Sequence, residues 1–222
     1  GGAQIKNVVL DGSLLKSALN IRRLSVDKLA GSTFKASGTI NNLGGIPEMK
    51  NIRLDAKAND ISRLFLLAGA EAPVDSKKLG AVTFAGRIDG SALNPRIDLN
   101  LKGAGASIAA AGKVSFLPLI GGFTGKMKVV HGDLVRMMRS LGVSYRPGGK
   151  LGGLDLQSDV KADMKGLVLE NLKGQVGPVK MNGTAEVSLT GPRTKLIADL
   201  NTGRIVADRF LPVSRNAFLT GP

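Results

Sequence analysis

The chain has 222 residues, of which 31 are lysine or arginine and 17 are aspartate or glutamate, giving a net charge of +14 at pH 7. The absence of cysteine excludes disulfide bonds, Cys-ligated zinc and thiol catalysis, and no apolar run of about 18 residues is present to form a membrane-spanning helix. Aromatic residues make up only 4% of the chain and glycine occurs 30 times, which favours long sheets with closely passing backbones over a conventional enzyme core.

The first predicted unit consists mainly of strands. Apolar runs occupy residues 5–10 and 14–24, and residues 34–40 alternate apolar or small side chains with polar ones. A turn cluster at residues 41–47 leads to residues 51–58, which alternate again. A period of two gives each strand one dry face and one wet face.

The second predicted unit repeats this arrangement. Residues 82–88 and 96–102 flank a turn that contains Pro95, and further strands follow at residues 107–116 and 126–130. The alternation is therefore that of consecutive antiparallel strands joined by short turns.

The third predicted unit contains the clearest alternation in the chain. Short runs at residues 154–156, 160–164 and 168–172 precede residues 179–189, where every second residue is apolar or small. A final strand is predicted at residues 196–200. Together, the three units predict a mainly β protein.

Each unit is also expected to carry one short amphipathic helix or its equivalent. Asp60 and Asp133 are suitable N-caps, and each precedes apolar residues at helical spacing and then a glycine. The apolar positions are Ile61, Leu64, Phe65 and Ala68, closed by Gly69, and Leu134, Met137, Met138 and Leu141, closed by Gly142. Residues 203–212 occupy the corresponding slot in the third unit. We expect these helices to pack on the sheet, with contact to a lipid surface as the alternative.

Recurring landmarks indicate an internal repeat. Gly38, Gly112 and Gly183 lie in strands and are 74 and 71 residues apart, so the period is about 72 residues. These glycines are expected to permit bending and close approach of neighbouring strands. We predict one elongated body made of units at residues 1–74, 75–146 and 147–222.

The excess positive charge is spread along the chain. It is typical of a solvated polar face whose lysines and arginines keep sheet edges soluble. Attraction to an anionic partner such as phosphate headgroups is the alternative. Nucleic acid is a poorer match because aromatic platforms for stacking bases are missing.

Catalytic and cofactor signatures are absent from the sequence. His131 is the only histidine, and its place at a strand-to-helix junction predicts a solvent-facing or capping role. The segment around Gly125-Lys126 fails the P-loop pattern at Ile120 and at Met127, and Gly103-Ala104-Gly105 lacks the third glycine of a dinucleotide site, because position 108 is isoleucine. We therefore expect no enzyme activity, no metal and no cofactor.

A sheet of many alternating strands has a long apolar face, which must close, pair with another sheet or hold something apolar. We hypothesise a curved sheet folded into a trough, with the apolar face inward and acyl chains held against it. The candidate lining residues are Ile52, Leu54, Ala56, Ile97, Leu99, Leu101, Val179, Met181, Ala185 and Val187.

Two stretches resemble the AsmA family of bacterial envelope proteins. Residues 29–40 read Leu-x-Gly-x-x-Phe-x-Ala-Ser-Gly-x-Ile, and residues 207–212 read Ala-Asp-Arg-Phe-Leu-Pro, similar to the family's recurring Asp-Arg-Tyr-Leu-Pro with Phe210 in place of tyrosine. Three strand glycines are each followed nine residues later by a turn proline, at Gly38 and Pro47, Gly86 and Pro95, and Gly183 and Pro192. With these turns, the resemblance covers essentially the whole chain. It implies a repeating β-groove of the bridge-like lipid-transfer type.

The resemblance also implies a location and partners. AsmA-like proteins are anchored in the inner membrane by an N-terminal helix, have a periplasmic body and are implicated in phospholipid traffic to the outer membrane. We expect this chain to be an excised piece of such a protein, with its anchor outside it. The expected partner is phospholipid or another acyl-chain lipid, with envelope proteins as possible further partners. The alternative is a structural or protein-docking scaffold involved in outer-membrane protein assembly.

Overall fold

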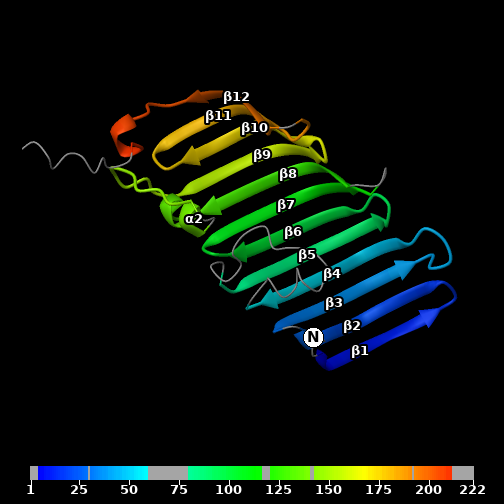
Figure 1. The fold of residues 1–222 in the computed structure, drawn as a ribbon. Coiled ribbons are helices and arrows are strands. Elements are labelled where there is room, and N and C mark those ends of the chain that lie inside the picture. The colour runs from blue at the N-terminus through cyan, green and yellow to red at the C-terminus, as the bar shows by residue number, and fades with distance from the viewer. Residues whose placement is uncertain are drawn as a thin grey trace, which may run out of the picture.

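The computed structural model describes residues 5–29, 31–59, 80–116, 121–140, 143–191 and 193–211. Most of these residues form one antiparallel β-sheet of twelve strands, in which each strand pairs with its neighbour in sequence from β1 to β12. Figure 1 shows the strands side by side in chain order across a long, curved sheet, with β1 and β12 at opposite edges. The sheet is therefore open rather than closed into a barrel.

The strands are 8–12 residues long. Their bounds are β1 Ile5–Leu15, β2 Ala18–Leu29, β3 Ser32–Asn41, β4 Glu48–Ala58, β5 Val82–Ser91, β6 Arg96–Gly103, β7 Ala106–Ser115, β8 Gly122–His131, β9 Leu154–Asp163, β10 Gly166–Val176, β11 Val179–Ser188 and β12 Lys195–Thr202. The predicted strands at residues 34–40, 51–58, 82–88, 96–102 and 179–189 are confirmed to within a few residues.

Two predicted boundaries are wrong. The sequence placed a break between apolar runs at residues 5–10 and 14–24, but β1 continues to Leu15 and the chain turns at Lys16 and Ser17. Lys16 has a φ of 52°, the positive value that a two-residue hairpin turn requires. Glycine or asparagine usually supplies this value, so the Lys16-Ser17 sequence does not mark the turn. The runs at residues 154–156 and 160–164 likewise belong to one strand, β9, because Ser158 continues the alternation between them.

One predicted helix is confirmed. Helix α2 (Leu134–Ser140) follows β8 and lies beside the ends of β8 and β9 (Figure 1). Asp133 caps it, since its Oδ1 accepts the backbone N–H of Arg136 at 2.9 Å. Leu134 is buried beneath the helix. The predicted Leu141 and Gly142 lie outside the described residues.

The expectation of one helix per unit is not confirmed. The predicted helix after Asp60 lies outside the described residues. The third slot contains only a 3-10 turn at Ala207–Arg209, so α2 is the single α-helix within the described ranges. The predicted units nevertheless contain equal numbers of described strands, with β1–β4, β5–β8 and β9–β12 in turn.

The landmark glycines lie where neighbouring backbones approach closely. A Cβ atom on Gly38 would lie 2.7 Å from the Ile52 Cα atom, and one on Gly112 would lie 2.6 Å from the Cα atom of Gly125 on the next strand. A Cβ on Gly183 would overlap the Asp199 carbonyl oxygen. The predicted close approach is therefore confirmed at all three glycines.

Candidate functional site

One face of the sheet is apolar across its whole width. A row of directly opposed residues crosses all twelve strands and is apolar or glycine in each strand except the last. This apolar row consists of Val8, Val26, Phe34, Ala56, Phe84, Leu101, Ile108, Val129, Leu156, Gly174, Met181 and Thr202. Directly opposed residues of antiparallel strands point to the same side, so the row marks one face of the sheet. At about 4.8 Å per strand, it is roughly 50 Å long.

The ten residues predicted to line the groove all lie on this apolar face. Three cross-strand rows join eight of them, and Val179 and Val187 lie on the same face near the two ends of β11. The apolar row holds Ala56, Leu101 and Met181, a neighbouring row holds Leu54 and Leu99, and a third row holds Ile52, Ile97 and Ala185. The predicted set is thus one continuous surface, while its contact with lipid stays a prediction.

Burial separates the two faces of each strand. All ten predicted residues are buried or half-buried, and their sequence neighbours on the other face are exposed, except for the half-buried Ser188 at the end of β11. In β4, for example, Ile52 is 8% exposed while Arg53 is exposed. Sequence reasoning omitted the phenylalanines of this face, although Phe34 and Phe84 follow the same alternation and belong to the apolar row.

Polar residues also occur on the apolar face: among the described residues, the buried Ser32 Oγ has no hydrogen-bond partner, whereas Ser158 and His131 are satisfied by hydrogen bonds. Ser158 lies opposite Met127, and its Oγ donates to the Glu170 carbonyl oxygen at 2.7 Å. His131 is 3% exposed; its Nδ1 accepts the backbone N–H of Asp133 at 3.0 Å, and its Nε2 lies 2.9 Å from the Ala104 carbonyl oxygen. Because Nδ1 is an acceptor, Nε2 carries the proton and donates to that carbonyl. The predicted capping role is confirmed, and the predicted solvent-facing position is wrong.

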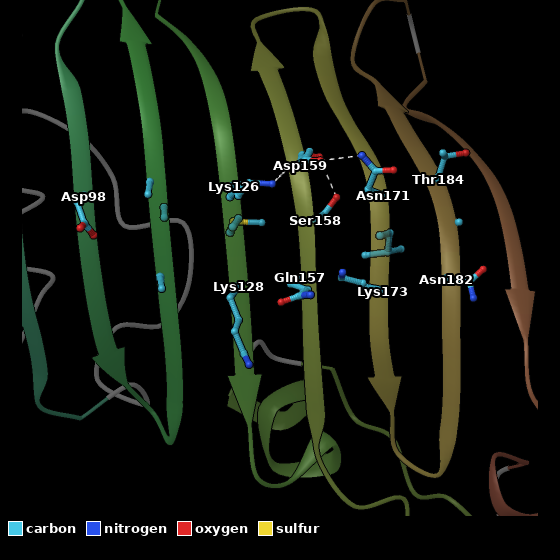
Figure 2. Close-up of a pocket in the computed structure, with 16 residues that line it drawn as sticks. Asp98, Lys126, Lys128, Gln157, Ser158, Asp159, Asn171, Lys173, Asn182 and Thr184 are labelled. Atoms are coloured by element: carbon cyan, nitrogen blue, oxygen red, sulfur yellow. Dashed lines mark hydrogen bonds and ion pairs between the residues drawn. The ribbon is translucent and has the colours of Figure 1, made fainter.

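The opposite face carries a polar hollow of about 850 Å³. Figure 2 shows its polar side chains on strands β6 to β11, with Lys126 directed at Asp159. Ala109 and Ala111 of β7 form part of its floor, since their side chains are short between the longer side chains of β6 and β8. Sequence reasoning missed this hollow; the signal was the alanine run of β7 within an otherwise polar face.

Charges in the polar hollow are largely paired. Lys126 Nζ donates to Asp159 Oδ1 at 2.7 Å, and Asn171 Nδ2 donates to Asp159 Oδ2 at 2.7 Å. The Lys126 hydrogen bond, and secondarily that of Asn171, lowers the pKa of the Asp159 carboxyl below its ordinary value. Lys128 pairs with Asp155 at 3.2 Å. These paired charges are consistent with the solvated polar face that the charge distribution predicted.

No family model matches the chain, and no curated protein or solved structure matches it. Among the described residues, no three or more His, Asp or Glu side chains gather as ligands for a metal ion. None of the helices in those residues has the length and apolar character needed to cross a membrane.

Proposed function

We propose that the chain is a non-enzymatic lipid-binding and lipid-transfer module of an AsmA-like bacterial envelope protein. The observation that carries the proposal is the apolar row, which continues from one edge of the sheet to the other without a charged residue. Such a surface suits a chain of methylenes, because burial of each methylene contributes about 0.8 kcal/mol and needs no directional contact.

The dimensions of the apolar face support more than one bound acyl chain. Strands of about ten residues are roughly 33 Å long, and twelve of them make a surface roughly 50 Å wide. Apolar side chains remain exposed at both edges, with Leu10 of β1 66% exposed and Leu196 of β12 68% exposed. A face that stays apolar to its edges suits passage of lipid along it better than storage in a closed cavity.

The finer parts of the proposal rest on the alternating strands, on the spacing of Gly38, Gly112 and Gly183, and, for location and cargo, on the family resemblance. They are a trough with its apolar face inward, built from repeat units at residues 1–74, 75–146 and 147–222. The body would lie in the periplasm, attached to the inner membrane by a segment outside this chain, and the cargo would be phospholipid. Lysines and arginines of the polar face would then stay in water.

A structural or protein-docking scaffold for outer-membrane protein assembly is the second candidate. The edge strand β12 favours it, because its ladder to β11 has no register shift along Lys195–Thr202 and the strand contains no proline. Such an edge offers unpaired backbone groups to an added strand of a partner.

Native mass spectrometry of the gently purified chain, followed by lipid extraction, tests the proposal. We expect co-purifying phospholipid, largely lost in a Leu99→Asp/Met181→Asp variant. The matched control is Asn100→Asp/Asn182→Asp, which adds the same charge to the adjacent exposed positions and should keep the lipid.

Circular dichroism must show that both variants remain folded. A folded, lipid-free wild-type protein would refute lipid binding and favour the scaffold. Equal loss of lipid in both variants would show that the apolar face has been assigned wrongly.

A further inference from the structure

A second hollow, of about 550 Å³, lies beside α2 and has a basic lining. Its residues come from α2 and the segment that follows: Arg136, Arg139, Ser140, Val143, Ser144, Tyr145 and Arg146. Three of these seven side chains are arginines and none is a carboxylate. We call this feature the arginine hollow.

The helical period brings two of the arginines together. Arg136, Arg139 and Ser140 are spaced i, i+3 and i+4, which puts them on one side of α2. Both arginines are exposed, whereas Leu134 on the same helix is buried. The amphipathic character of α2 therefore directs guanidinium groups away from the packed side of the helix.

The third arginine is positioned by a distant part of the chain. The Tyr145 hydroxyl donates a hydrogen bond to the Phe210 carbonyl oxygen, and the Gly148 N–H donates to the Leu211 carbonyl oxygen at 2.8 Å. These contacts hold the segment around Arg146 against residues 208–211. The hollow thus lies between two positioned parts of the chain: α2, with its buried Leu134, and the segment around Arg146.

Among the described residues, the arginines of the hollow have no acidic partner. No ion pair within the described residues involves Arg136, Arg139 or Arg146, although Lys126, Lys128 and Lys161 on the polar face each pair with a carboxylate. The Asp133 carboxylate accepts the Arg136 backbone N–H at the start of α2. Three guanidinium groups around one hollow, none of them paired with a carboxylate in the part of the chain that the structure describes, repel one another, and a bound anion would relieve that repulsion.

We propose that the arginine hollow binds a phosphate group. A guanidinium presents two parallel N–H donors that match two phosphate oxygens, and Ser144, which also lines the hollow, carries a hydroxyl that can donate a further hydrogen bond. The phosphate is either the headgroup of a lipid or part of a small soluble phosphate compound. The lipid form rests on the proposed function, since it would fix a headgroup while the acyl chains lie on the apolar face.

The site is tested with inorganic phosphate, by NMR of the arginine Nε–H signals of the full chain. We expect saturable shifts confined to Arg136, Arg139 and Arg146 in the wild-type protein. An R136Q/R139Q/R146Q variant should bind about tenfold more weakly or worse. The control R23Q/R96Q/R204Q removes the same charge from exposed, scattered arginines and should bind within about twofold of wild type.

Shifts spread over basic side chains throughout the protein, or equal weakening in the two triple variants, would overturn the proposal. Flotation with phosphatidylglycerol vesicles then identifies the source of the phosphate. A tenfold loss confined to R136Q/R139Q/R146Q would assign a lipid headgroup. If the two variants float equally and the wild-type protein still shows the shifts with inorganic phosphate, the ligand of the arginine hollow is a soluble phosphate compound. Inorganic phosphate contains no acyl chain, so its binding tests the arginine hollow independently of the apolar face. The phosphate site can therefore be confirmed even if the proposed lipid transfer is refuted.

Discussion

The two faces of the sheet are built from the same strands and differ in almost every physical respect. On the apolar face, the residues of the apolar row from β2 to β11 are half-buried, and only at the edge strands β1 and β12 is the row exposed. On the polar face, ion pairs such as Lys161–Glu170 lie at the surface, with 59% and 43% of the two side chains exposed. Backbone pairing alone therefore says nothing about function here; the side to which a residue points decides what it can bind.

The two faces also contribute unequally to the stability of the fold. Exposed ion pairs contribute at most about 1 kcal/mol each, because water already solvates both charges and holding two long side chains costs entropy. Burial of a large aliphatic side chain contributes about 1.5–3 kcal/mol. We therefore expect substitutions on the apolar face to have large effects on stability, and matched substitutions on the polar face to have small ones.

The largest effect is expected for a charge on the apolar face. Ile52→Asp should lower the free energy of unfolding by about 3 kcal/mol or more, because Ile52 is 8% exposed and lies opposite Ile88, where a carboxylate would lose its hydration. Arg53→Asp, one residue away on the exposed face, should change it by less than about 0.5 kcal/mol. Urea denaturation measures both. Similar losses of stability in the two variants would show that the two faces do not differ in their contribution to the free energy of unfolding.

A smaller loss is expected where two strands approach closely. Gly183 has a φ of 147°, and an added Cβ would overlap the Asp199 carbonyl oxygen. Gly183→Ala should therefore destabilise the fold by about 2–3 kcal/mol, through backbone displacement between β11 and β12. Gly132→Ala is the control, since an added Cβ there meets nothing within 4 Å. Thermal unfolding measures both variants. An equal decrease in unfolding temperature for the two substitutions would contradict the close approach of β11 and β12 at Gly183.

The smallest effect is expected for a polar-face ion pair. Lys161→Gln removes the 2.8 Å contact to Glu170 and should cost at most about 0.5 kcal/mol. That loss should shrink further at 1 M salt, where screening acts over about 3 Å. Urea denaturation at low and high salt checks both statements. A loss above about 2 kcal/mol would mean that the polar face contributes more than its exposure indicates.

Alternation made much of the candidate site predictable from sequence. Residues such as Leu99 and Met181 were assigned to one face because a strand directs every second side chain to the same side, whatever lies beside it. The same reasoning missed the turn at Lys16 and the alanine floor of the polar hollow. The first has no glycine or proline signature, and the second appears only when neighbouring strands are set side by side.

The sequence by itself determined the strands, their two faces, the Asp133 cap of α2 and the glycines at which backbones meet. These features depend on local periodicity and on the conformational limits of single residues. Only the tertiary structure decided the register that links Val8 to Thr202 through all twelve strands, and the contact of Tyr145 with Phe210 beside the arginines. Both depend on pairings between segments far apart in the chain, which local propensity does not encode.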